Sequence, residues 1–275
     1  MSYYCTLADA RRELKVPPAS LGGDGALFGY IRYASRRIDQ YMMPRKRRPF
    51  FEPYIETRNY LVSQRNVSSN DNTLYFNEAL LAFTDLDIAG TTITTQAVQY
   101  PPVDTPFYHL RLTSYSNSWY GYCSSDGSPS RLSITGTWGY NSDYDNAWLA
   151  TGALSTGIND SVTSFDVGAG EGALFSPGML LRVESEFMRL LSVTIDTLTV
   201  TRGANGSTAS AHDSADSVDV WQVEPDVQHV VARQAGLLGA RVGAFDSATI
   251  DALGVTQYPS DLLTELRAVV TAYQF

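Results

Sequence analysis

The sequence predicts an α+β protein, with a helical bundle from N- and C-terminal helices, a central antiparallel β-module and an inserted small β-domain. Three observations lead to this fold class. Apolar residues recur at helical steps near both ends of the chain, and segments rich in β-branched and aromatic residues fill the middle. A second strand-rich segment follows a Gly/Ser/Asn stretch at 155–160. Helices and strands that are segregated along a chain are typical of α+β proteins.

Two helices are expected near the start. The first covers 6–15, where Thr6 is placed to cap the helix and Asp9 to return a hydrogen bond in the first turn. Pro17 and Pro18 cannot continue this helix. The second covers 25–43, because apolar residues recur there at steps of three and four, namely Leu27, Ile31, Ala34, Ile38 and Tyr41. This stripe predicts a helix face buried in a bundle.

The middle of the chain is predicted to be β-rich. A β-module is expected over 54–140, followed by a short helical start over 146–153 and a linker at 155–160. The inserted β-domain is expected over 157–223. Two closing helices are expected over 225–241, with Pro225 at the first helical position, and over 260–272. The core thus comprises 1–156 and 224–275.

Charge is unevenly distributed along the 275 residues, whose net charge is −9. Residues 1–55 hold 10 of the 20 basic residues and five of the 29 acidic ones, a balance of +5, so the remainder carries −14. Such a chain does not attract nucleic acid through bulk electrostatics. The basic run Arg45, Lys46, Arg47 and Arg48 is interpreted first as a solvated loop, and second as a contact to DNA or to an acidic neighbour.

No enzyme motif, metal-ligand spacing or cofactor motif is found, so no catalytic residue, metal or cofactor is expected. Cys5 and Cys123 fit no metal spacing and are expected to be free thiols. No apolar run of membrane-spanning length and no signal-peptide pattern is seen, so synthesis and assembly in a cytoplasm are expected, without membrane contact.

Two polar clusters are candidate sites. Arg202, His212, Asp213 and Asp216 could serve acid–base chemistry, but a turn that caps backbone groups is the favoured interpretation. Glu184 and Glu186 are expected on one face of a strand. They could bind a cation together with nearby Asp residues, although a solvent-facing strand edge is favoured.

Four segments, taken in order and spacing, resemble the head–tail adaptor (connector) family of long-tailed bacteriophages. They are residues 6–14 (TLADARREL), 34–41 (ASRRIDQY), 134–140 (ITGTWGY) and 239–245 (GARVGAF). The insert resembles a β cassette of phage structural proteins, marked by residues 177–178 (PG), 184–186 (ESE), 201–207 (TRGANGS) and His212. The adaptor family usually keeps a helix continuous where this chain breaks at 155–160.

The resemblance implies a structural phage neck protein that joins the capsid portal to the tail as an oligomeric ring with a DNA channel. The implied partners are the portal protein, a head-closure (stopper) or tail-side neck protein, and further copies of the chain, commonly twelve. Double-stranded DNA would pass through the channel without sequence-specific binding. The implied location is the virion neck, at the head–tail interface, with no enzymatic activity.

Candidate contact residues follow from this resemblance and from the end of the chain. The portal-binding candidates lie on the last helix and tail, namely Leu266, Val270, Tyr273, Gln274 and Phe275. Folding of these residues back onto their own bundle is the other interpretation. Trp138 and Tyr140 are candidates for anchoring a neighbouring subunit, although a core position is favoured for Trp138.

Two other function classes stay open. A carbohydrate- or surface-binding module of a tail or capsid decoration would use Trp119, Tyr120 and Tyr122 to stack on sugars. The terminal helices count against it, because such modules are usually all-β. A hydrolase of unknown type is the third class, and the lack of a converging catalytic group counts against it.

Overall fold

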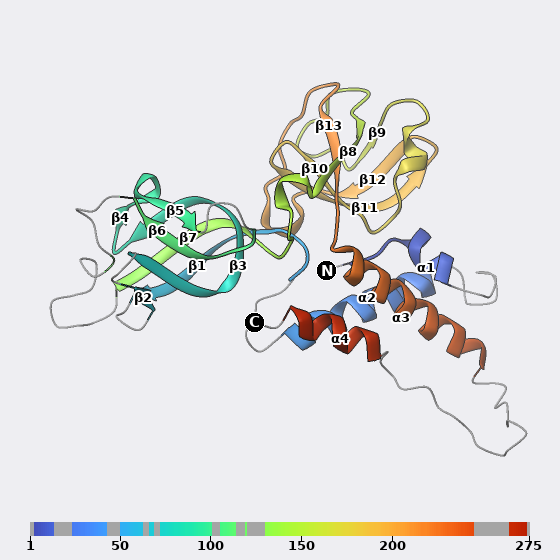
Figure 1. The fold of residues 1–275 in the computed structure, drawn as a ribbon. Helices are drawn as coiled ribbons and strands as arrows, with labels where there is room; N and C mark the ends of the chain where they lie inside the picture. Colours follow the sequence, from blue (N-terminus) through green and yellow to red (C-terminus); the bar gives the residue numbers. More distant parts are fainter. Residues whose placement is uncertain are drawn as a thin grey trace, which may run out of the picture. The chain divides into compact units, whose positions relative to one another are not determined.

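The protein is mostly β rather than helical. The computed structural model describes residues 3–13, 24–42, 50–62, 66–68, 72–100, 105–113, 119, 130–244 and 264–273. Within these residues, two antiparallel sheets of seven and six strands accompany four α-helices (Figure 1). The predicted helical bundle with a central β-module is therefore wrong. Each sheet has its own hydrophobic core, so much of the buried apolar surface lies on sheet faces instead of between helices.

The chain divides into two compact units. The first comprises Met1–Pro44, Trp148–Ala204 and Thr208–Phe275, and the second comprises Arg45–Ala147 and Asn205–Ser207. The six-stranded sheet and the helices thus share the first unit, while the seven-stranded sheet forms the second.

The seven-stranded sheet has the strand order β1-β7-β3-β6-β5, and β2 and β4 pair with β3. Its strands are β1 (Tyr54–Val62), β2 (Val67–Ser68), β3 (Thr73–Ile88), β4 (Thr91–Thr92), β5 (Ala97–Tyr100), β6 (Phe107–Leu112) and β7 (Ser130–Trp138). Burial alternates along β7, as expected for a strand with one core face. At Gly136 of β7 a Cβ atom would lie 2.3 Å from the Ala82 carbonyl oxygen, so only glycine lets β3 approach this closely.

The helices are α1 (Leu7–Glu13), α2 (Asp24–Met42), α3 (Pro225–Ala244) and α4 (Thr264–Ala272). The predicted buried stripe of α2 is confirmed at Leu27, Ile31, Ala34 and Ile38. The predicted cap of α1 is also confirmed. The Asp9 backbone N–H donates to Thr6 Oγ1 at 3.1 Å, and the Thr6 backbone N–H donates to Asp9 Oδ2 at 2.9 Å. In the described ranges no helix is both long and apolar enough to cross a membrane.

The six-stranded sheet, called the β domain below, has the order β8-β13-β10-β11-β12-β9. Its strands are β8 (Trp148–Ala153), β9 (Ser164–Asp166), β10 (Leu180–Val183), β11 (Glu186–Thr194), β12 (Thr197–Thr201) and β13 (Ser217–Trp221). The short helical start predicted at 146–153 is wrong. Residues 148–153 form the strand β8, which pairs antiparallel with β13, from Trp148 opposite Trp221. The 155–160 stretch also belongs to the domain, through bridges from Leu154 to Val167 and from Ile158 to His212.

Candidate functional site

The densest polar cluster of the described chain lies inside the β domain and is centred on Arg202, directly after β12. All five guanidinium N–H groups have acceptors. Nε and one Nη2–H donate to the two carboxylate oxygens of Glu186, both at 2.7 Å. The others donate to the backbone carbonyls of Asn159, Val162 and Ser210, at 2.8, 2.7 and 2.5 Å. One buried cation therefore ties β11 to two loops, 154–163 before β9 and 202–216 after β12.

Glu186 is the anionic partner in this cluster, and its side chain is fully buried. Besides Arg202, it accepts the backbone N–H groups of Gly203 and Ser210, each at 3.0 Å. Burial alone would raise the pKa of Glu186, but the hydrogen bonds from Arg202, Ser210, Gly203 and His212 lower it to about 2. The Glu186 carboxylate is therefore ionised, and its hydrogen bonds stabilise the fold of the β domain.

His212 joins this buried pair to one further acid, Glu184. Its Nε2 lies 2.9 Å from Glu186 Oε2, and its Nδ1 lies 3.0 Å from Glu184 Oε2. The His212 side chain is fully buried, whereas that of Glu184 is 63% exposed. Ligand atoms of Glu184, His212 and Asp216 all lie within 4.8 Å of one another. The cluster thus runs from a buried ion pair to an acidic rim.

The structure brings together the two polar groups that the sequence left apart. Arg202, His212 and Asp216 belong to one group, and Glu184 and Glu186 to the other. The expected shared strand face is wrong in detail, because Glu184 occupies the turn between β10 and β11 with a φ of 51°, and Glu186 begins β11. Asp213 is exposed and lies outside the set of ligand atoms. Two features of the sequence point to this cluster. Glu186 stands directly before the apolar Phe187, and Arg202 stands directly after the strand 197–201.

This cluster has a structural role in the geometry shown. Catalysis by acid–base or nucleophilic chemistry needs a group with spare capacity beside an open volume. The donors of Arg202 and the carboxylate of Glu186 instead form hydrogen bonds within the fold. Cys5, a free thiol, is buried, and burial raises its pKa, so it is not an activated nucleophile.

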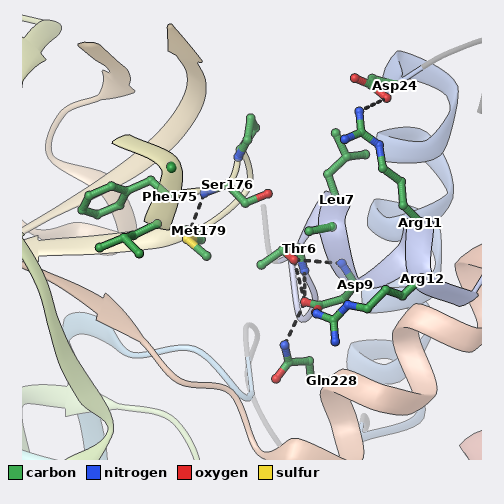
Figure 2. Close-up of a pocket in the computed structure, with 14 residues that line it drawn as sticks. Thr6, Leu7, Asp9, Arg11, Arg12, Asp24, Phe175, Ser176, Met179 and Gln228 are labelled. Atoms are coloured by element: carbon green, nitrogen blue, oxygen red, sulfur yellow. Dashed lines mark hydrogen bonds and ion pairs between the residues drawn. The ribbon is translucent and has the colours of Figure 1, made fainter. Parts of the chain in front are cut away.

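A second candidate site is a cleft of about 500 Å³ within the first unit, between α1 and the segment 173–179 (Figure 2). Polar side chains line the helix side, and Phe175 and Met179 line the other. The charges are already paired: Arg11 with Asp24 and Arg12 with Asp9. Gln228 of α3 donates to Asp9 Oδ2 at 2.8 Å (Figure 2). The cleft therefore offers no unmatched charge to a ligand, and its polar wall mainly joins α1 to α3.

The portal-binding candidates of the last helix lie partly in the protein's own core. Leu266 and Val270 are buried, at 0% and 2% exposure. The Tyr273 hydroxyl donates to Asp226 of α3, at 2.9 Å to Oδ1. Gln274 and Phe275 lie outside the described residues. α4 therefore packs on its own chain at Leu266 and Val270, and Tyr273 is half-buried.

The two candidate anchors differ in exposure. Trp138 is fully buried in the core of the seven-stranded sheet, and its indole N–H donates to the Glu56 carbonyl at 3.1 Å. The Arg58 guanidinium stacks over its ring at 4.3 Å. Tyr140 is partly exposed and packs against Phe50 and Phe51. Trp138 is therefore a core residue, and only Tyr140 presents surface to a neighbour.

The remaining candidates from the sequence are the basic run and the aromatic residues proposed to stack on sugars. Arg45, Lys46, Arg47 and Arg48 lie outside the described residues. Trp119 is fully buried in the core of the seven-stranded sheet, and its backbone N–H donates to Asn72 Oδ1 at 3.1 Å. It is therefore not a surface platform for a sugar. Tyr120 and Tyr122 lie outside the described residues.

Comparison with known proteins returned no matching family model and no matching curated protein.

Proposed function

We propose that this protein is a structural component of a tailed-phage neck, an adaptor that assembles as a ring between the capsid portal and the tail. It acts by binding proteins on each side of the ring and leaving a channel for DNA. The proposal rests on the resemblance of four sequence segments to the connector family. The structure supports it through one observation, the packing of both α1 and α4 against α3 among the described residues.

The two ends of the chain meet in a small helix cluster. Gln228 of α3 donates to Asp9 of α1 at 2.8 Å. Arg233 of α3 pairs with Glu265 of α4, and Tyr273 donates to Asp226. Both β regions are therefore inserted between helices that pack together. This order, with terminal helices first and last and two β regions between them, is the order on which the resemblance depends.

The use of polar groups supports an assembly role over an enzymatic one. The most polar buried cluster, around Arg202 and Glu186, is saturated with hydrogen bonds inside the β domain. The charges beside the cleft are paired with each other. Such side chains hold a rigid scaffold, which is what a component of a symmetric ring requires.

The test is assembly of the full-length protein, alone and with the portal protein of the same phage. We expect negative-stain images and native mass spectrometry to show a closed ring with a central channel, alone or on the portal. A monomer at micromolar concentration that also fails to bind portal would contradict the proposal.

Truncation after Thr271 separates the role of the tail from the role of the ring. We expect the truncated chain to form rings and to lose portal binding. Tyr273→Phe should keep both, because it removes only the hydroxyl that donates to Asp226 and retains the aromatic ring. Normal portal binding by the truncated chain would show that the tail is not the anchor.

A further inference from the structure

The contact between His212 and Glu184 joins two atoms that can both bind a metal ion. Nδ1 of His212 lies 3.0 Å from Glu184 Oε2. An ionised carboxylate only accepts hydrogen bonds, so a bare imidazole lone pair facing it is repulsive. Either a proton or a metal ion must lie at this contact.

The opposite side of the ring already makes the carboxylate contact that supports a histidine binding a metal through Nδ1. Nε2 lies 2.9 Å from Glu186, a carboxylate held in place by Arg202. In the tautomer with the proton on Nε2, the ring donates to Glu186 and its Nδ1 lone pair is directed at Glu184. A histidine whose far nitrogen donates to a buried carboxylate is the usual arrangement of a metal ligand with its supporting shell.

The charge balance points the same way. Arg202 and Glu186 form one buried ion pair, and two further acids, Glu184 and Asp216, have carboxylate oxygens close to the His212 ring. A divalent cation neutralises these two acids. The donor atoms of the three residues lie within 4.8 Å of one another. Bonds of about 2.0–2.2 Å require only a small inward rotation, and Glu184, with a side chain 63% exposed, is free to make it.

We propose that Glu184, His212 and Asp216 form a binding site for one divalent transition-metal ion of the zinc class, completed by water. A nitrogen ligand beside two carboxylates favours zinc over magnesium or calcium, which prefer oxygen ligands alone. The ion joins the turn between β10 and β11 to the loop before β13. This site replaces the sequence-based expectation of no metal, and it does not depend on the adaptor function.

The ligands escaped detection in the sequence because they come from separate elements. Glu184 lies 28 residues before His212, and motifs for zinc rely on short, regular spacings. The cation site that the sequence suggests for Glu184 and Glu186 shares Glu184 with the proposed site. The structure assigns Glu186 to the supporting shell and brings His212 and Asp216 to Glu184 instead.

The experiment is calorimetric titration of the metal-free full-length protein with zinc chloride, and separately with magnesium chloride, near pH 7.5. We expect one zinc ion per chain and no comparable magnesium binding. Glu184→Gln and Asp216→Asn should each weaken zinc binding by about tenfold or more, since each removes a charged ligand. Asp213→Asn is the matched control, because it removes the same charge from a neighbouring exposed acid and no ligand.

Hydrogen exchange of the same samples reports where the ion binds. We expect zinc to slow exchange in 184–185 and 213–216 of the wild type and of Asp213→Asn. Absence of zinc binding would overturn the proposal and leave a second ring proton at the contact. Zinc binding unchanged by Glu184→Gln would also overturn it, because the ion would then lie elsewhere. Glu184 is exposed, so this variant is informative even if Asp216→Asn fails to fold.

Discussion

Removal of the Arg202 charge should lower the stability of the β domain more than removal of any exposed charge in that domain. Arg202→Met deletes five hydrogen bonds and leaves the fully buried Glu186 carboxylate without its counter-ion. Breaking a buried ion pair by removing one partner costs about 3–5 kcal/mol. We expect the free energy of opening of the β domain to fall by that amount.

A matched comparison and a double variant separate this effect from simple charge loss. Asp219→Asn disrupts the Arg182–Asp219 pair of the same sheet, whose side chains are 31% and 15% exposed, and should cost less than Arg202→Met because this pair keeps more contact with water. Arg202→Met combined with Glu186→Gln should be less destabilised than Arg202→Met alone, because no unpaired charge then stays buried.

The assay is native-state hydrogen exchange on the full-length protein, followed in β11 and β12, with calorimetric melting as a second readout. The reasoning is refuted if Arg202→Met lowers protection in these strands no more than Asp219→Asn does. It is equally refuted if the double variant is less stable than the single one, since the penalty would then not come from a buried charge.

Two further predictions concern the seven-stranded sheet and the start of α1. Gly136→Ala should destabilise the sheet by about 2 kcal/mol or more, because the new methyl group would meet the Ala82 carbonyl oxygen at 2.3 Å. Gly29→Ala in α2 should instead stabilise the protein by about 0.5–1 kcal/mol, because a Cβ at this position meets nothing within 4 Å. Thermal melting of both variants checks the pair, and equal effects would contradict the close-approach argument. Burial tends to raise the pKa of Asp9, but hydrogen bonds from Thr6 and Gln228 and the charge of Arg12 hold it below its ordinary value of 3.8. The stabilisation by Asp9 is therefore complete above that value and is lost as the pH falls through the lower folded pKa. Asp9→Asn should lose this acid dependence, measured by hydrogen exchange in α1, and an unchanged dependence would assign it to another group.

The sequence by itself determined the elements whose signals are local. The steps of three and four in α2 predicted the buried stripe, because a helix face repeats every 3.6 residues whatever the helix packs against. The pairing of Thr6 with Asp9 predicted the cap of α1, because both partners lie within one turn. Pro225 marked the start of α3 for the same reason, since its lost N–H is harmless at the first helical position.

Only the tertiary structure decided the balance of the fold and the composition of the polar cluster. Trp148–Ala153 is a strand because β13, more than 60 residues away, offers it backbone partners, and no local pattern records that pairing. Separation along the chain is also the reason that the sequence did not predict the polar cluster. Glu184, Glu186, Arg202 and His212 become neighbours only when β10, β11 and the loops after β12 come together. Charged residues in a sequence do not state whether they face water or each other, and burial, which sets their chemistry, is a property of the assembled sheet.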